Sequence, residues 1–226
     1  MELMKISGRL IVLEGPDGVG RTSHARLLSQ RLEAQGVATA NFGLARSALI
    51  SEHIEANSGQ LHNFGPRTRA LLYATDMWDQ VVHHIQPALD AGFVVVADRF
   101  SYTPIIRESV RGTSKEWLNG LYSSVPVPDT VIVLDAGPKR ILHRVIYTDG
   151  IAELKGYESG MDLGHSNIPT VSFLHYQKLL RGKFKQLAKE NNFPIVSTKG
   201  TFEDTHEEIW KNVEPIVSDL IVKSSN

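Results

Sequence analysis

The sequence predicts an α/β fold in which a parallel sheet is covered by helices on both faces. Short apolar runs typical of buried strands recur along the chain, and helical patterns separate them. One run, Phe93 to Ala97, is continuously apolar, as expected for a strand covered on both faces. Strands that alternate with helices require crossover connections, and these are right-handed and produce a parallel sheet.

The first part of the chain contains two of the expected strands. Leu10 to Leu13 is short, apolar and partly β-branched, and it leads into a loop. Thr22 to Gln35 has alanine and leucine at helical spacing, and Gly36 is a favourable stop. Val37 to Phe42 is expected to be the second strand, and Arg46 to Asn57 a shorter helix.

The middle of the chain predicts a long helix and a buried strand. A loop from His62 to Gly65 is followed by a proline, which is favoured in the first turn of a helix. One helix is expected from Arg67 to Asp90. The strand Phe93 to Ala97 follows it and ends at the pair Asp98-Arg99.

The remaining elements continue the alternation, with one exception. Residues 148–169 are rich in glycine and have no strong period, so we expect a mobile surface segment there. The other expected elements are a helix over Lys115 to Ser124, a strand over Thr130 to Leu134, a helix over Lys139 to Tyr147, a helix over 170–190, a strand over 194–197 and a helix over 202–219.

The bulk composition predicts one globular domain spanning residues 1–226. The 24 basic residues almost cancel the 25 acidic ones, so a protein that coats nucleic acid or an anionic membrane is not expected. The chain has no cysteine, which excludes disulfides, thiolate metal sites and cysteine nucleophiles. No apolar run is long enough to span a bilayer, and Met1 to Gly8 lacks the features of a secretory signal, so a cytoplasmic location is expected.

A phosphate-binding loop is predicted between the first strand and the first helix. Its pattern is close to Gly-x-x-x-x-Gly-Lys-Ser/Thr, in which glycines let backbone N–H groups point at phosphate oxygens and the helix N-terminus adds a favourable dipole. Thr22 stands where a hydroxyl binds Mg²⁺, whereas Arg21 replaces the usual lysine and brings a planar fork. The sequence therefore predicts a P-loop NTPase fold. The expected ATP-binding residues are Gly15, Pro16, Asp17, Gly18, Val19, Gly20, Arg21 and Thr22.

A second polar cluster, Asp98 and Arg99, is expected at the carboxyl end of a buried strand. Open α/β sheets place their ligands at this edge, so both side chains would face the same cleft as the phosphate loop. The alternative is that Asp98 caps the next helix and Arg99 pairs with a surface carboxylate.

Four segments in this order resemble the thymidylate kinase family: Glu14-Gly-Pro-Asp-Gly-Val-Gly-Arg-Thr, Leu71-Leu-Tyr-Ala-Thr-Asp, Ala97-Asp-Arg-Phe and Pro128-Asp-Thr-Val-Ile-Val-Leu-Asp. The resemblance extends from residue 8 to about 215. It implies a five-stranded parallel sheet and transfer of the γ-phosphoryl group of ATP to thymidine monophosphate with Mg²⁺. Family members are typically homodimers, and the helix expected at 67–90 is a candidate interface.

The resemblance also implies roles for individual residues. Asp17 would contact the acceptor side and help to order the transferring groups, Asp98 would serve the metal and its water, and Arg99 would grip the acceptor phosphate. Tyr73 would stack on the thymine base, although an aromatic residue on an apolar helix is otherwise typical of a core. Phosphoryl transfer requires positioned oxygens and neutralised charge, and such a set supplies both.

Residues 148–169 resemble the lid of the family, which closes over ATP and excludes water. Family members carry a catalytic basic residue either directly after the aspartate of the phosphate loop or in the lid. Gly18 occupies the first place, so the chain resembles the lid type. Arg144 at the start of the lid and Lys155 within it are the candidates, and the alternative is that both are solvated charges.

Three positions depart from the family on the acceptor side. Phe42 stands near the place of a second phosphate-gripping arginine, with Arg46 as a candidate substitute. Met77 replaces the arginine that reads the thymine carbonyl, and Arg107 lies near the place of an aromatic against the 2′ carbon of the sugar. A site that loses a donor loses discrimination sharply. The arginines that could compensate are Arg67, Arg69, Arg107 and Arg111.

The leading hypothesis is a thymidylate kinase that depends on Mg²⁺ and ATP. Its alternatives are a kinase for another nucleoside monophosphate, suggested by Met77 and Phe42, and a nucleotide-binding module without turnover, suggested by Arg21. A motor or a nucleic-acid-stimulated ATPase is disfavoured because no basic stripe is present. The expected catalytic residues are Asp17, Arg21, Asp98, Arg99 and Arg144, the acceptor-binding residues are Tyr73, Arg99, Arg46 and Arg107, and the metal-binding residues are Thr22 and Asp98.

Overall fold

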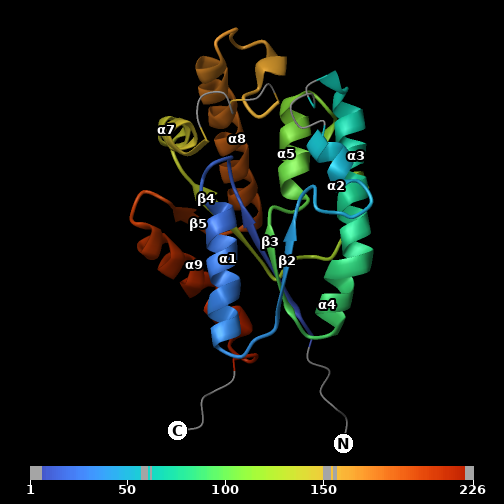
Figure 1. Cartoon of the computed structure of the whole chain (residues 1–226), viewed down its shortest axis with the longest axis vertical. Helices are drawn as coiled ribbons and strands as arrows, with labels where there is room; N and C mark the ends of the chain where they lie inside the picture. The colour runs from blue at the N-terminus through green and yellow to red at the C-terminus, as the bar shows by residue number, and fades with distance from the viewer. Residues whose placement is uncertain (1–6, 57–60, 62, 150–153, 155–156, 222–226) are drawn as a thin grey trace, which may run out of the picture.

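The computed structural model describes residues 7–56, 61, 63–149, 154 and 157–221. Its centre is a five-stranded parallel sheet in the order β2-β3-β1-β4-β5 (Figure 1). The α/β fold predicted from the sequence is therefore confirmed, and so are all five expected strands. They are β1 (Arg9–Glu14), β2 (Thr39–Gly43), β3 (Val94–Asp98), β4 (Thr130–Asp135) and β5 (Ile195–Ser197).

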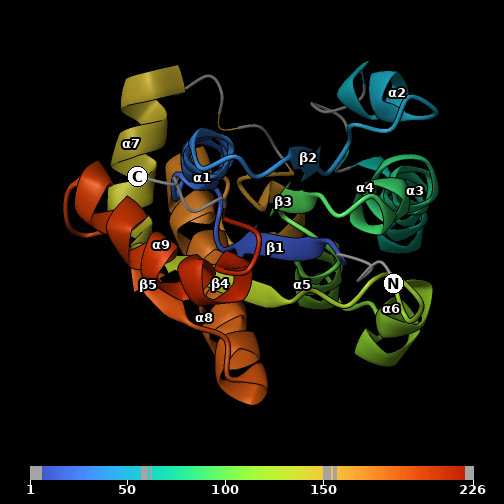
Figure 2. The same cartoon turned by 90° about the horizontal axis from the view of Figure 1, so that it is seen from below.

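Helices cover both faces of the sheet, as Figure 2 shows from below. Successive residues of β1 point to opposite faces. Ile11 and Leu13 pack with α1 and α9, whereas Leu10 and Val12 pack with α3 on the other face. On that second face, α5 and α8 also cover β4. The helices are α1 (Arg21–Ala34), α2 (Ser51–Ala56), α3 (Pro66–Gln80), α4 (Gln86–Asp90), α5 (Tyr102–Val110), α6 (Lys115–Leu121), α7 (Pro138–Asp149), α8 (Pro169–Asn191) and α9 (Phe202–Val217).

The parallel arrangement brings the carboxyl ends of the strands to one edge of the sheet. Glu14 ends β1, Gly43 ends β2, Asp98 ends β3 and Asp135 ends β4. Three of these four residues carry a carboxylate that is nearly or fully buried. The loop before α1 starts at the same edge, so the polar residues predicted as functional converge there.

Helix α5 was missing from the sequence prediction. Its sequence contains Pro104, but this proline lies in the first turn, where its missing N–H costs no intrahelical bond. The helix owes its place to tertiary packing, because it contacts α3, α6 and α8. The omission matters, since α5 carries Arg107.

The long helix expected at 67–90 is a continuous helical path with a change of hydrogen-bonding pattern in its middle. A π-helical turn, Val81–Ile85, separates α3 from α4. Pro87 follows this turn and cannot donate a backbone hydrogen bond. Prolines and π-helical turns are known causes of a local change in the hydrogen-bonding pattern of a helix. The helix expected at Arg46 to Asn57 begins later, since α2 is the only helix among the described residues 46–56.

The surface segment expected at 148–169 is partly buried. Among its described residues, Tyr157 and Ser159 are buried, and a 3-10 turn spans Met161–Leu163. That part of the prediction is wrong because Tyr157 packs under Arg69 of α3 and Arg107 of α5. Lys155 lies outside the described residues, and the lid assignment stays a prediction. None of the helices in the described part of the chain combines the length and apolar character needed to cross a membrane.

Candidate active site

The phosphate loop has the strand–loop–helix context that its sequence predicted. It leaves β1, passes Gly15 at φ 139° and enters α1 after Gly20 at φ 98°. Residues other than glycine rarely adopt such backbone angles. A Cβ on Gly15 would also lie 2.4 Å from the carbonyl oxygen of Leu134 in β4. The loop therefore depends on glycine for both its turn and its close packing on the sheet, while Val19 anchors it in the core.

Arg21 is turned toward the loop that carries it. Its Nη1 donates to the carbonyl oxygens of Gly15 and Pro16 at 2.6 and 2.5 Å, and its Nε donates to Oδ1 of Asp98 at 3.1 Å. Burial and the nearby Arg99 lower the pKa of Arg21 to about 10, so it stays charged at neutral pH. In the ligand-free protein, the guanidinium thus braces the loop and holds Asp98.

Thr22 and Asp98 lie together at the start of α1. The Thr22 hydroxyl donates to Oδ2 of Asp98 at 2.5 Å. Burial would raise the pKa of Asp98, but the charges of Arg21 and Arg99 outweigh it and lower the pKa. The two side chains predicted to serve a metal are therefore in contact, and the carboxylate is ionised.

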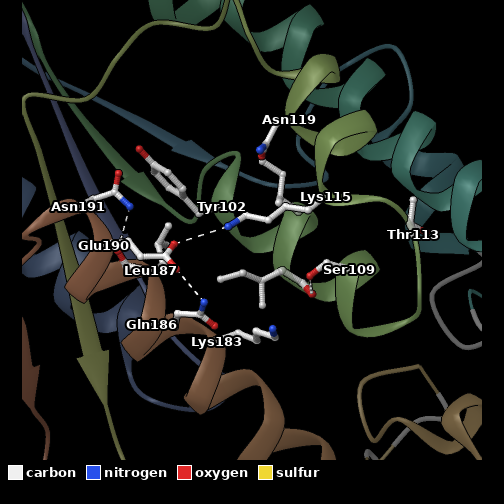
Figure 3. A pocket seen from close by; sticks show the side chains of 12 residues that line it. Tyr102, Ser109, Thr113, Lys115, Asn119, Lys183, Gln186, Leu187, Glu190 and Asn191 are labelled. Atoms are coloured by element: carbon white, nitrogen blue, oxygen red, sulfur yellow. Dashed lines mark hydrogen bonds and ion pairs between the residues drawn. The ribbon is translucent and has the colours of Figure 1, made fainter.

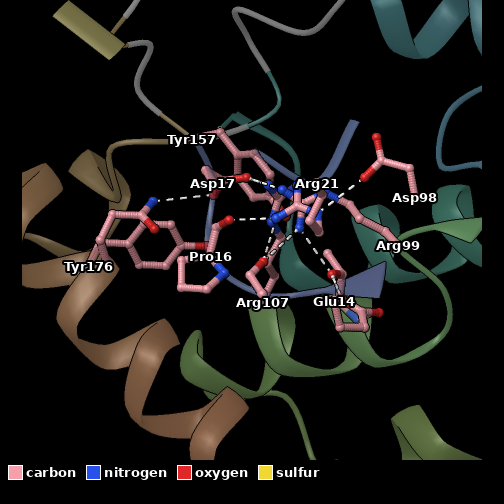
Figure 4. A network of polar contacts seen from close by, with 12 residues as sticks. Glu14, Pro16, Asp17, Arg21, Asp98, Arg99, Arg107, Tyr157 and Tyr176 are labelled. Atoms are coloured by element: carbon pink, nitrogen blue, oxygen red, sulfur yellow. Dashed lines mark hydrogen bonds and ion pairs between the residues drawn. The ribbon is translucent and has the colours of Figure 1, made fainter. Parts of the chain in front are cut away.

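Asp17 is the centre of a network of charged groups (Figure 4). Arg99 donates to its Oδ1, Arg107 donates to the same oxygen at 2.6 Å, and Gln177 of α8 donates to Oδ2 at 3.2 Å. Burial acts to raise the pKa of Asp17, but Arg107 and Arg99 hold it well below its usual range. Arg99, which donates to Asp17, has a left-handed backbone conformation with φ 75°. This conformation is uncommon for a non-glycine residue and frequent at functional sites.

Glu14 supports this network and was not singled out from the sequence. It is fully buried and accepts hydrogen bonds from the backbone N–H groups of Phe100 and Thr103 at 2.9 and 3.2 Å. The Thr103 hydroxyl donates to Glu14 at 2.6 Å and accepts from Arg99 at 3.0 Å. Burial raises the pKa of Glu14, and Thr103 and Arg99 oppose the rise. The signal was present in the sequence, because an acidic residue directly before the loop ends a buried strand.

A cavity of about 500 Å³ opens beside this network. Tyr73, from α3, is buried in its wall, and Arg46, Arg99 and Arg107 also line it. The structure thus brings together all four side chains predicted to bind the acceptor. The remaining lining residues are Asp17, Arg21, Thr22, Leu44, Ala45, Ile54, Leu61, Asp98 and Glu158.

Arg46 is held at the cavity by α3. The buried carboxylate of Asp76 accepts hydrogen bonds at 2.8 Å from the backbone N–H groups of Ala45 and Ser47, on either side of Arg46. The Arg46 guanidinium lies over Gly43, where a Cβ would meet it at 2.5 Å, and reaches to 4.0 Å from Asp98. Helix α3 therefore supplies Tyr73 directly and positions Arg46 through Asp76.

A second cavity of about 350 Å³ also lies beside the phosphate loop. Gly18, Gly20, Arg21 and Thr22 line it together with Arg144, which donates to the Gly18 carbonyl oxygen at 3.2 Å. The prediction that Arg144 is the catalytic basic residue at the start of the lid stays a prediction, and this contact places its side chain beside the phosphate loop. Because Arg21 and Thr22 line both cavities, the two spaces meet at these residues.

The departures from the family resemblance have different structural outcomes. Phe42 and Met77 are both buried in the core and line neither cavity. Of the four arginines that could compensate, only Arg107 lines the cavity beside Tyr73. Arg67 is exposed, Arg69 pairs with Glu108, and Arg111 pairs with Asp162. Sequence could not show this because it does not reveal the direction of a side chain.

A further cavity of about 560 Å³ lies between α5, α6 and α8 (Figure 3). Tyr102, Ile106 and Leu187 are among its apolar lining residues, and Lys115 forms an ion pair with Glu190 at its rim. None of the functional residues predicted from the sequence lines it, so it is separate from the site at the phosphate loop.

A phosphate loop that opens the first helix and two adjoining cavities, one of them rich in arginine, are the arrangement expected of a P-loop nucleoside monophosphate kinase. The family model described as "Thymidylate kinase" matches residues 13–209. The chain therefore belongs to the thymidylate kinase family.

Individual relatives and a solved structure agree with this assignment. The chain is 31% identical to a "Probable thymidylate kinase" from Pyrococcus abyssi, over 89% of this chain and 94% of that protein. It is 26% identical to a "Thymidylate kinase" from Danio rerio, over 93% and 92% of the two chains. A crystal structure of thymidylate kinase from Ehrlichia chaffeensis superposes with a TM-score of 0.67 at 18% identity, covering 92% of this chain and 99% of that one. The last comparison supports the fold alone.

Proposed function

We propose that the chain transfers the γ-phosphoryl group of ATP to thymidine monophosphate, forming thymidine diphosphate and ADP. The observation that carries the proposal is the meeting of two cavities at Arg21 and Thr22, one beside the phosphate loop and one beside Tyr73. Membership of the thymidylate kinase family supports the choice of acceptor.

The donor occupies the cavity beside the loop in this proposal. Backbone N–H groups of the loop and the N-terminus of α1 face the phosphates, and Arg144 adds a positive charge from α7. Arg21 places its positive charge where the two cavities meet. Its hydrogen bonds to the carbonyl oxygens of the loop must break for it to reach a phosphate oxygen.

The acceptor occupies the larger cavity. Its base stacks on Tyr73, and its phosphate lies between Arg46, which reaches to 4.0 Å from Asp98, and Arg99, which is paired with Asp17. Binding of a phosphate would compete with Asp17 for Arg99, and Arg107 then keeps Asp17 paired. The positive charges thus surround the place where negative charge develops on the transferring phosphoryl group.

Mg²⁺ fits the residues at the junction. It prefers oxygen ligands and usually combines one or two protein groups with phosphates and water. The Thr22 hydroxyl and the ionised Asp98 carboxylate are two such groups in contact, beside the cavity assigned to the donor. When bound with ATP, Mg²⁺ neutralises charge on the phosphate oxygens.

A coupled assay of ADP formation tests the proposal. The purified chain is given ATP, Mg²⁺ and each nucleoside monophosphate in turn, and thymidine monophosphate is expected to have the highest kcat/KM. Turnover of another monophosphate but not of thymidine monophosphate would contradict the substrate, whereas ATP binding without any turnover would contradict the enzyme. Chelation of Mg²⁺ with EDTA should abolish turnover, and addition of excess Mg²⁺ should restore it.

We also propose a homodimer that forms through α3 and its surroundings. Leu49, Leu71 and Val82 are exposed apolar residues in this region, and Leu71 and Trp78 line a shallow apolar hollow there. Sedimentation velocity should give the mass of two chains, and Leu71→Glu should give the mass of one. A wild-type monomer at all accessible concentrations would contradict the dimer. A cytoplasmic location stays a prediction, and the cysteine-free sequence is compatible with it.

A further inference from the structure

The cavity between α5, α6 and α8 is a separate hollow that the proposed reaction does not use (Figure 3). Its volume of about 560 Å³ exceeds the 500 Å³ of the cavity assigned to the acceptor. It also lies within the roughly 300–1,000 Å³ typical of sites for small molecules. Among the described residues, none lines both this cavity and either cavity beside the phosphate loop. The cavity therefore has room for a further small molecule while both substrates are bound.

Part of the lining of this cavity is apolar and includes an aromatic ring. Ile105 and Ile106 line it from α5, and Leu187 lines it from α8. The Tyr102 ring lines it as well and packs edge-to-face on Phe193, with ring centroids 5.6 Å apart and an interplanar angle of 71°. A ring held in this way gives a flat ligand a fixed surface on which to pack.

Three side-chain amides line the same cavity, from Asn119 of α6 and from Gln186 and Asn191 of α8. Gln186 donates to Glu190 at 2.7 Å, and Asn191 donates to the carbonyl oxygen of Leu187 at 2.9 Å. The side-chain oxygens of these two residues, and the whole amide of Asn119, form no hydrogen bond with another described residue. An amide both donates and accepts, and the edge of a nucleobase carries donors and acceptors in one plane. The amides therefore match such an edge.

The cavity carries more positive than negative charge. Lys115 and Lys183 line it, and Glu190 is the one carboxylate among its described lining residues. Lys115 reaches Glu190 at 3.6 Å, but the two side chains are 62% and 45% exposed, so this ion pair is weak. Gln186, Lys115 and Lys183 all lower the pKa of Glu190, so both lysines lie near this carboxylate. The excess of positive charge favours an anionic group such as a phosphate.

We propose that this cavity is a second nucleotide-binding site. The base packs on Tyr102, the amides contact the edge of the base, and the phosphates lie at Lys115 and Lys183. The site is not catalytic, because none of its lining residues belongs to the phosphate loop. A fatty acid would use the apolar residues and the lysines but would leave the three amides without a partner, so a nucleotide is the better match.

Calorimetric titration of the full chain with its catalytic site filled tests the proposal. The catalytic site is filled with adenosine and thymidine joined 5′ to 5′ through five phosphates, and adenosine and thymidine triphosphates are then titrated in turn. At least one of the two triphosphates is expected to bind at one site per chain. The free nucleoside and inorganic triphosphate should each bind roughly tenfold or more weakly, because each lacks one set of contacts.

Variants of three residues locate the binding. Lys183→Glu should weaken it by roughly 10- to 100-fold, the loss typical of a hydrogen bond to a charged group. Ser109→Trp adds a large side chain to the lining and should abolish it. Lys178→Glu is the matched control, because Lys178 is also an exposed lysine of α8 but does not line the cavity, and its affinity should be unchanged. Since Lys183 is exposed, Lys183→Glu keeps the test valid if Ser109→Trp fails to fold.

Two results would overturn the proposal. One is that neither triphosphate binds the filled chain, and binding of laurate in that case would make the cavity a fatty-acid site. The other is an equal effect of Lys183→Glu and Lys178→Glu. Failure of the joined compound to bind would instead contradict the proposed function. The same titrations of the unfilled chain then decide the proposal, because a nucleotide in this cavity is weakened by Lys183→Glu and not by Lys178→Glu.

Discussion

Replacement of Arg69 by methionine should destabilise the fold by about 3–5 kcal/mol, because it leaves a buried carboxylate without its cation. Arg69 is 1% exposed and Glu108 is fully buried. Two parallel contacts join them, Nε to Oε1 and Nη2 to Oε2, both at 3.0 Å. Arg69 also donates to the carbonyl oxygens of Leu61 and Phe64, and the Tyr157 hydroxyl donates to Glu108 at 2.9 Å.

The magnitude follows from this geometry. Loss of one partner of a buried ion pair costs several kcal/mol, whereas loss of both is much less costly. The variant Arg69→Met with Glu108→Gln removes the unpaired charge, so it should be more stable than Arg69→Met alone by at least about 1 kcal/mol. For a domain of this size, 3–5 kcal/mol corresponds to a fall in Tm of about 6–20 °C.

Urea unfolding followed by circular dichroism measures these free energies, and Lys211→Met is a suitable control. Lys211 pairs with Glu208 on the surface at 3.1 Å, with both side chains more than half exposed, so its loss should cost less than about 1 kcal/mol. A cost below about 1 kcal/mol for Arg69→Met, or no recovery in the double variant, would refute the reasoning. The pair also joins α3 to α5, so its loss should raise KM for the acceptor.

Three further outcomes are expected. Asp98→Asn should lower kcat by about 100-fold or more and raise the Mg²⁺ concentration needed. Asp135→Asn, at the end of β4 and outside both cavities beside the phosphate loop, should affect kcat less than about tenfold. Similar losses in the two variants would remove Asp98 from the site. Asp76→Leu should lower the free energy of unfolding by about 1–3 kcal/mol. It should also raise KM for the acceptor more than it lowers kcat. An unchanged KM would contradict the role of Asp76 in holding Arg46. Burial, His206 and Arg144 lower the pKa of His24 to about 4, below the usual value near 6.5. Between these pH values the unfolded chain therefore binds more protons than the folded chain. The free energy of unfolding thus falls as pH decreases from about 6.5 to 4. His24→Phe should reduce that fall by up to about 3 kcal/mol in unfolding experiments at pH 7 and pH 4, and an acid-induced loss equal to that of the wild type would contradict the assignment.

The dependence on pH illustrates how little of the site is local. His24 is buried because Phe202 of α9 stacks on its ring at 4.2 Å and His206 lies beyond it at 6.0 Å. These residues are far apart in sequence. Periodicity could place His24 on α1, but the packing of α9 against α1 determines its pKa.

Local pattern was sufficient to predict the strands, the phosphate loop and the position of Asp98 and Arg99. Buried parallel strands are continuously apolar in sequence. The backbone turns that need a positive φ are marked in the sequence by Gly15 and Gly20. Since parallel strands share one edge for their carboxyl ends, residues that follow two of them could be expected to meet.

The tertiary structure decided which side chains face the ligands. Arg21, expected to reach the phosphates, instead bonds to the loop carbonyls and to Asp98, which is 77 residues away in sequence. Met77 and Phe42 turn into the core, whereas Arg107, on a helix that the sequence did not predict, lines the cavity proposed for the acceptor and pairs with Asp17. The physical reason is that secondary structure follows from neighbours along the chain, whereas the direction and charge of a side chain follow from neighbours in space.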